Sequence, residues 1–264
     1  MITLVSHFST YSTLILIGLF FALLVILECG RRIAVKRMAD DPTGAKMGIT
    51  EVEGAIFALL GLMIAFTFYG ASQRLDVRRQ MIVSETNAIG TAWLRIDILP
   101  DASQQQIRML FKEYTQARLG INQKLPDVTA AQEQLAIANR LQDEIWQVAV
   151  LACKASPSPM VGLLVLPALN DMFDNATAHN TSLMTHPPFM IFFTLIFLIL
   201  ISSFYVGYAL AGAKRANWLH GTGYALVMLG IFYVIIDFEF PRVGFIHLGA
   251  YDKPLIELSD KMGK

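Results

Sequence analysis

Cysteine and charge are both scarce in this chain of 264 residues, and each scarcity excludes a class of protein. The only cysteines, Cys29 and Cys153, lie far apart, so we expect neither a disulfide framework nor a zinc-binding pattern. Charged residues make up 16% of the chain and balance to a formal net charge of zero, which gives no basis for a nucleic-acid partner. Strand-like alternation of apolar and polar residues is also missing.

Charge is absent altogether from four long stretches of the chain. Asp, Glu, Lys and Arg do not occur in residues 8–27, 54–73, 187–213 and 216–236. A helix rises about 1.5 Å per residue, so roughly twenty residues cross a hydrocarbon core of about 30 Å. Inside lipid a helix satisfies its own backbone hydrogen bonds, which an open strand cannot do. We therefore expect an all-α integral membrane protein with four transmembrane helices.

The segment between the second and third of these stretches is polar, and its periodicity predicts helices. Apolar residues recur at seven-residue steps along two neighbouring seams of the first one: Leu75, Ile82, Ile89 and Ile96, with Ala92 and Leu99. This spacing is typical of a helix packed on other helices. Three more helices are expected, of which the second begins at a capping box of Thr129 and Gln132 and the third spans 160–184.

These patterns divide the chain into four parts. They are a first pair of spans with a basic loop, an extramembrane helical bundle, a second pair of spans and a C-terminal segment: residues 8–73, 74–186, 187–236 and 237–264. The helical bundle is thus inserted between the second and third spans.

Basic residues near the spans predict the orientation. Seven of them lie in the two short connections, 29–50 and 214–217: Arg31, Arg32, Lys36, Arg37, Lys46, Lys214 and Arg215. Four lie close to the opposite boundary: Arg74, Arg78, Arg79 and Arg242. Short loops rich in Lys and Arg stay in the cytoplasm, so we expect both connections there and the helical bundle on the other side.

The second span carries small residues at helical spacing. Gly54, Ala58, Gly61 and Ala65 follow one another at steps of four, three and four. Small residues let membrane helices approach closely, so helix packing is one interpretation. The other is a pore helix crowded around an axis, where apolar side chains form a constriction that excludes water. The candidates for that role include two flanking aromatic residues: Phe57, Gly61, Ile64 and Phe68.

Charged residues mark both ends of the same span. Glu51 and Glu53 stand at its start, where the helix dipole favours a carboxylate. Arg74 and Arg78 follow its end, where a long basic side chain reaches the membrane interface. In an oligomer these positions are also candidates for charged rings at a pore entrance, acidic at one end and basic at the other.

A third group of charged residues follows the fourth span. Asp237 and Glu239 come just before Arg242. They are interpreted either as solvated groups or an ion pair at the membrane boundary, or as functional groups, because ionisable side chains at membrane depth are costly.

Signals for metal binding and catalysis are weak. Asp171, Asn175 and His179 recur at steps of four, but without a second histidine at ligand spacing a solvated helix face is favoured. No nucleophile elbow, phosphate loop or dinucleotide fingerprint is present. We therefore expect no metal, no other cofactor and no enzymatic activity.

Two blocks of sequence carry a family resemblance. The first comprises residues 53–68, 74–80 and 85–95, and the second comprises residues 234–246. Together they resemble the bestrophin-like domain family of bacterial membrane proteins. The resemblance implies a distant relation to bestrophins, which are pentameric ion channels with four spans per subunit and a pore lined by the second span. Their helical domain is cytosolic, so resemblance and charge bias imply opposite sides for the bundle.

The leading hypothesis is a homo-oligomeric ion channel, with a pentamer implied by the resemblance, in the bacterial cytoplasmic (inner) membrane. Its partners would be the lipid bilayer, further copies of the chain and small inorganic ions. The alternative is a non-conducting membrane-anchored sensor or scaffold whose helical bundle binds a partner.

The charge bias yields a direct test of orientation. We expect a periplasm-specific reporter fused after Lys124 to be active, because the seven basic residues hold the short connections in the cytoplasm. The same reporter fused after Lys36 serves as the control and is expected to be inactive. Activity of a cytoplasm-specific reporter after Lys124 would instead favour the arrangement implied by the resemblance.

Overall fold

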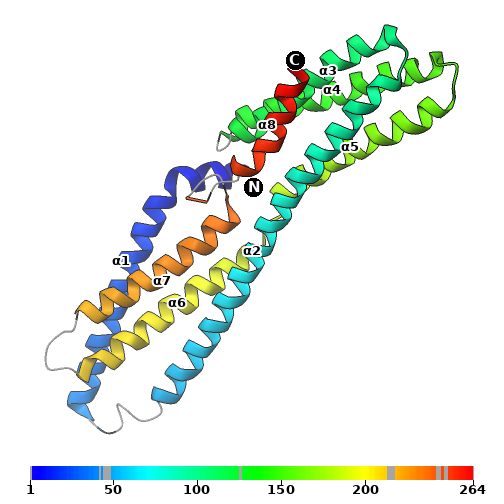
Figure 1. Ribbon diagram of the computed structural model, residues 1–264. Coiled ribbons are helices and arrows are strands. Elements are labelled where there is room, and N and C mark those ends of the chain that lie inside the picture. The colour runs from blue at the N-terminus through cyan, green and yellow to red at the C-terminus, as the bar shows by residue number, and fades with distance from the viewer. Residues whose placement is uncertain are drawn as a thin grey trace. The chain divides into compact units, whose positions relative to one another are not determined.

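The computed structural model describes residues 2–41, 43, 49–124, 127–212, 218–241, 245–246 and 249–263, with the side chains of 2–13, 212 and 250 excepted. Helices account for nearly all of this part of the chain, and no strand occurs in it. The prediction of an all-α protein is confirmed. In chain order the elements are α1 (Ile2–Asp40), α2 (Ile49–Arg95), η2 (Ile96–Ile98), α3 (Asp101–Lys124), α4 (Val128–Ala155), α5 (Met160–Met184), α6 (Phe189–Ala209), η3 (Leu210–Gly212), α7 (Trp218–Glu239) and α8 (Gly249–Gly263) (Figure 1).

Four helical segments are long and apolar enough to cross a membrane. They are Leu14–Asp40, Ile49–Ile98, Met160–Ala209 and Trp218–Glu239. Each contains one of the charge-free stretches or most of one. The charge-free stretches therefore coincide with helical segments that are long and apolar enough to span a bilayer.

The helix α1 extends further than the sequence analysis expects. A loop was expected from Cys29, but the helix continues to Asp40. Glu28 accepts hydrogen bonds from Arg31 at 2.7 Å and from Arg32 at 2.8 Å, and ion pairs at these spacings stabilise a helix. Proline at position 42 disfavours helical geometry in the residue before it, so the helix ends close to that point.

The chain forms two structural units, which we describe separately. The bundle unit comprises Met1–Ser6, Arg74–Thr185 and Phe240–Lys264, and the apolar unit comprises His7–Gln73 and His186–Glu239. The helix α2 contributes to both units. The C-terminal helix α8 belongs to the bundle unit and packs on α3.

The core of the bundle unit follows the predicted seams of α2. All six predicted seam residues are at most 3% exposed: Leu75, Ile82, Ile89, Ala92, Ile96 and Leu99. The last four of them in the chain, from Ile89 onward, share one core with buried side chains of α3, α4 and α5, such as Phe111, Ile145 and Met172. Leu255 and Met262 of α8 complete this core. The heptad spacing is therefore confirmed as a helix-packing signal.

The predicted capping box at the start of α4 is wrong. Asp127 is the N-cap residue, and its carboxylate accepts hydrogen bonds from the backbone N–H groups of Thr129 and Ala130, each at 3.1 Å. Asp and Thr are both suitable caps, but Asp127 comes first and satisfies the free N–H groups of the first turn. Thr129 therefore lies inside the helix rather than at its cap.

In the apolar unit, α1 and α6 approach each other closely at glycine residues. A Cβ atom on Gly30 would overlap the backbone of Phe204, and a Cβ atom on Gly207 would overlap the backbone of Leu27. On the same side Ser203 donates a hydrogen bond to the carbonyl oxygen of Leu23 at 2.9 Å. Small residues of this kind allow two helix backbones to come into contact.

We expect Gly30→Ala to destabilise the protein by about 1–3 kcal/mol, because the added methyl group meets rigid backbone rather than a side chain that can move. The matched control is Gly18→Ala on the same helix, where the added Cβ has no neighbour within 4 Å. Thermal unfolding in detergent should show a lower Tm for Gly30→Ala and an unchanged or slightly higher Tm for Gly18→Ala. Equal shifts for the two variants would contradict the close contact.

Candidate functional site

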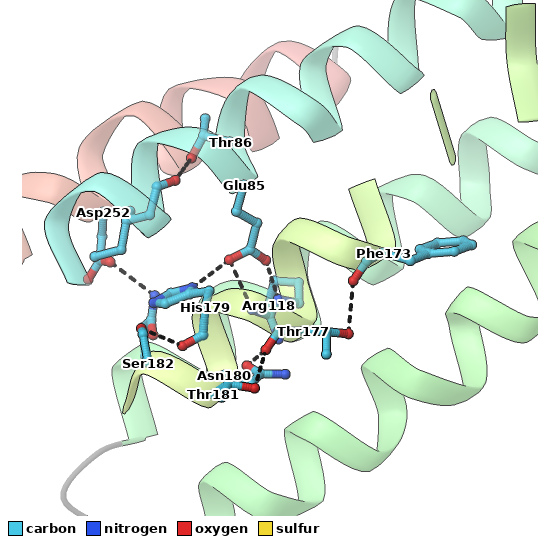
Figure 2. A network of polar contacts seen from close by, with 12 residues as sticks. Glu85, Thr86, Arg118, Phe173, Thr177, His179, Asn180, Thr181, Ser182 and Asp252 are labelled. Carbon is cyan, nitrogen blue, oxygen red and sulfur yellow. Dashed lines mark hydrogen bonds and ion pairs between the residues drawn. The ribbon is translucent and has the colours of Figure 1, made fainter. Parts of the chain in front are cut away.

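The largest group of buried charges lies in the bundle unit and centres on Glu85. Its carboxylate accepts hydrogen bonds from Nε and Nη2 of Arg118, the latter at 2.9 Å, and lies 2.5 Å from Nδ1 of His179 (Figure 2). Arg118 also donates from Nη1 to the side chain of Asn180 at 2.9 Å. Because these residues come from α2, α3 and α5, one carboxylate connects three helices.

Because the network is buried, each of its charged groups depends on its partners in place of water. The side chains of Glu85, Arg118 and His179 are 2–3% exposed. Burial by itself lowers the pKa of Arg118, but the negative charge of Glu85 and its hydrogen bonds outweigh burial and raise that pKa above its usual value. Arg118 is therefore a permanent cation here. A cation without water requires its counter-ion, so Glu85 and Arg118 are present as a charged pair.

Polar contacts on α3 surround the pair. One turn before Arg118, burial raises the pKa of the Tyr114 hydroxyl to about 12, and this hydroxyl accepts a hydrogen bond from Gln142 at 3.1 Å. One turn after it, Asn122 donates to Asp252 of α8 at 3.0 Å. These two contacts join α3 to α4 and α8 within one turn of Arg118.

His179 is placed differently from the sequence analysis, which favours a solvated face shared with Asp171 and Asn175. Asp171 is exposed and Asn175 half-buried, whereas His179 is buried. Steps of four drift by about 40° each around a helix, so the third residue in such a series turns away from the first. His179 instead continues the apolar stripe of Met172 and Ala176, and this relation in the sequence would have identified it.

The burial of Glu85 is also visible in the heptad spacing of α2. Counting back from Leu99 and Ala92 in steps of seven gives Glu85 and then Arg78. Both charged residues are at most 2% exposed. The seam predicted from apolar residues therefore also contains two buried charged residues, Glu85 and Arg78. The spacing of apolar residues by itself does not predict their burial.

Arg78 was expected at an exposed membrane boundary, but the structure buries it. Its Nε donates to the carbonyl oxygen of Ser182 at 3.2 Å, and its Nη2 donates to that of Thr185 at 3.1 Å. These carbonyl groups lie at the C-terminal end of α5, where backbone acceptors lack helical partners and a positive charge is favoured. Arg78 thus caps α5, and it does not line an exposed ring. Arg74 is half-buried.

The pore candidates of α2 lie on adjoining parts of the helix surface in the apolar unit, and only some of them contact another helix. The small residues Gly54, Ala58, Gly61 and Ala65 are all exposed, and a Cβ on Gly54 or Gly61 would have no neighbour within 4 Å. Phe57 instead packs edge-on against Tyr224, with ring centroids 6.3 Å apart, and Phe68 packs against Phe238 at 5.3 Å. Both ring partners belong to α7. Ile64 is half-buried.

The remaining charged candidates of the apolar unit lie at helix ends. Glu51 is exposed and Glu53 half-buried in the first turns of α2. At the end of α7, Asp237 is 5% exposed and Glu239 is fully buried, and Oε1 of Glu239 lies 2.8 Å from Nδ1 of His186. The interpretation of these two carboxyl groups as solvated is wrong. Arg242 lies outside the described residues, and His186 was not identified from the sequence.

The network is suited to holding helices together through charge rather than to binding a metal. Within the described ranges, no group of three or more His, Cys, Asp or Glu side chains gathers in a way that would hold a metal ion. One feature with unused chemical capacity is the ring of His179, whose Nε2 is buried and has no hydrogen-bond partner among the residues described.

Comparison with known proteins provides no relative. No protein-family model matches the chain, and neither a curated protein nor a solved structure is significantly similar to it. The resemblance to the bestrophin-like domain family therefore stays a prediction.

We expect Glu85→Gln to destabilise the bundle unit by about 3–5 kcal/mol, because it leaves the buried guanidinium of Arg118 without a counter-ion. The control is Glu144→Gln, which removes the partner of Arg140 from an exposed pair and is expected to cost less than about 1 kcal/mol. Denaturant titration of the purified protein, followed by tryptophan fluorescence, measures both. If the two variants lose similar stability, the buried pair does not have the role that its geometry indicates.

Proposed function

We propose that this chain is one subunit of a homo-oligomeric ion channel in the bacterial cytoplasmic membrane, with α2 beside the pore. The observation that carries the proposal is the exposed face of small residues on α2. In the described part of the chain, no helix covers the exposed residues Gly54, Ala58, Gly61 and Ala65. Small residues are used where membrane helices approach closely, so a second copy of the chain suits this face.

The length of α2 supports a membrane helix that continues outside the bilayer. Its 47 residues correspond to about 70 Å at 1.5 Å per residue, which is more than twice a hydrocarbon core of about 30 Å. The charge-free run 54–73 fits the core, and the charged seam beyond it fits an extramembrane bundle. A pentamer is proposed from the resemblance to bestrophins.

The contacts of α2 refine which side chains would border a pore. Phe57 and Phe68 lie at the edge between the exposed face and the α7 contact, whereas Gly61 lies within the exposed face. Glu51 and Glu53 would form an acidic entrance at the start of the helix. Arg78 caps α5 and is removed from the proposed entrance, so the basic end of the span contributes less to ion selection.

The second candidate, a non-conducting sensor or scaffold, is favoured by a different observation. The bundle unit has its own core from five helices, and it buries an ion pair whose members are 33 residues apart. Such a unit can present a binding surface without any pore. In that case the apolar helices would serve as the anchor.

Current recording in planar bilayers separates the two candidates. We expect the wild-type oligomer to conduct, Phe57→Ala to raise conductance by removing bulk beside the pore, and Glu53→Gln to reduce any preference for cations. Gly61→Leu should abolish either assembly or current because it fills the exposed face, whereas Gly230→Leu adds the same bulk on α7 and serves as its control.

The oligomeric state is measured in the same preparations by mass determination in detergent. Silent bilayers for wild type and all variants, with oligomers present, would exclude the channel and leave the scaffold. A wild-type protein that is only monomeric would remove the basis for both the pore and the α2 interface.

A further inference from the structure

The imidazole ring of His179 has one bonded and one unbonded nitrogen in a site closed to water. Nδ1 lies 2.5 Å from Oε2 of Glu85, and Nε2 has no hydrogen-bond partner in the described part of the chain. The side chain is 2% exposed. Figure 2 shows the ring between the helices that carry Glu85 and Arg118.

The contacts of Glu85 determine which nitrogen carries the hydrogen. The carboxylate already accepts two hydrogen bonds from Arg118, and an ionised carboxylate only accepts. The hydrogen between Glu85 and His179 therefore belongs to Nδ1, which donates it. A neutral ring with its hydrogen on Nδ1 has a lone pair on Nε2, so this nitrogen can accept one proton.

We propose that Nε2 of His179 is a proton-binding site, and that proton binding opens the packing of α5 against α2 and α3. A proton on Nε2 creates a positive charge and a buried N–H group for which no described residue provides an acceptor. The carboxylate of Glu85 attracts a charged ring and the guanidinium of Arg118 on the same carboxylate repels it, but neither group supplies an acceptor for the new N–H on Nε2. Proton binding is therefore favoured in a conformation that lets water reach Nε2.

The groups that face this site come from four helices. They are Glu85 of α2, Arg118 of α3, Asn180 of α5 itself and Asp252 of α8 (Figure 2). Asp252 is the second carboxylate of the region, and Asn122 donates to it at 3.0 Å. Opening of α5 would place the ring in contact with water, which lowers the electrostatic cost of the added proton.

The linkage between proton binding and conformation gives the direction in which pH shifts the opening of α5. A ligand that binds the opened conformation better shifts the equilibrium toward that conformation, and here the ligand is the proton. Acidification is expected to open the bundle unit near His179 and alkaline conditions to close it. The proposal does not depend on ion conduction, so it stands or fails separately from the proposed channel.

Hydrogen–deuterium exchange of the purified full-length protein tests the proposal. Exchange is compared at about pH 7.5 and about pH 5.5, a range in which histidine changes its charge, with rates corrected for the intrinsic effect of pH. We expect protection of the α5 amides near His179 to fall at least about tenfold in acid, since an unpaired buried donor disfavours the closed form. Amides of α4 distant from the site should change much less.

The matched variant is His179→Asn, whose amide nitrogen retains the donor to Glu85 but does not titrate. It should show the same α5 protection at both pH values. His186→Asn makes the same change at the partly buried contact with Glu239, which lies in the apolar unit, and should keep the wild-type response. His179→Gln is the second variant if the asparagine variant does not fold.

Three outcomes would overturn the proposal. They are unchanged or increased α5 protection of the wild type in acid, a wild-type response that persists in a folded variant at position 179, and a response abolished by His186→Asn. If neither variant at position 179 folds, the distribution of the acid-induced loss of protection in the wild type decides whether the proposal holds. A loss of amide protection that is confined to the surroundings of His179 supports the proposal. A loss of protection spread evenly over the bundle unit overturns it.

Discussion

The bundle unit depends on the ion pair between Glu85 and Arg118. Taking a carboxylate and a guanidinium out of water is costly, and the cost is offset only when the geometry satisfies both groups. Here the two hydrogen bonds of the pair, the contact of Glu85 with His179 and the bond from Arg118 to Asn180 do so together. A shift of α2, α3 or α5 by one turn would leave a buried charge alone. The network therefore fixes the register of three helices, which apolar packing by itself specifies less sharply.

The helix α2 connects this constraint with the proposed function. Its first half presents an exposed face of small residues, and its second half carries the seam on which Arg78 and Glu85 lie. Both parts belong to one uninterrupted helix, Ile49–Arg95. The channel proposal rests on the first half and the proton-binding proposal on the second, so each can be tested by variants that leave the other half intact. Arg78, which caps the end of α5, adds a further contact between the second half and the rest of the bundle unit.

Much of the fold was predictable, and the errors have identifiable causes. The four apolar segments and the buried seam of Leu75, Ile82, Ile89 and Ile96 follow from hydropathy and periodicity. The capping box at Thr129 failed because Asp127, also a good cap, comes two residues earlier. The polarity of His179 favours a solvated face, but its position three residues after Ala176 places it on a buried stripe. Glu85 was passed over for the same reason, although it lies seven residues before Ala92.

The sequence by itself determined the all-helical fold class, the approximate positions of the helices and most of the apolar core. Each of these depends on residues within a few turns of one another. The tertiary structure decided which charges are buried and what they bind. Arg118 and His179 stand 33 and 94 residues from Glu85, and Thr185 stands 107 residues from Arg78. Local periodicity carries no information about such pairings. The structure likewise decided that Phe57 and Phe68 contact α7 and that the small residues beside them are exposed. Both parts of the α2 surface are apolar enough to be buried, so hydropathy does not distinguish them.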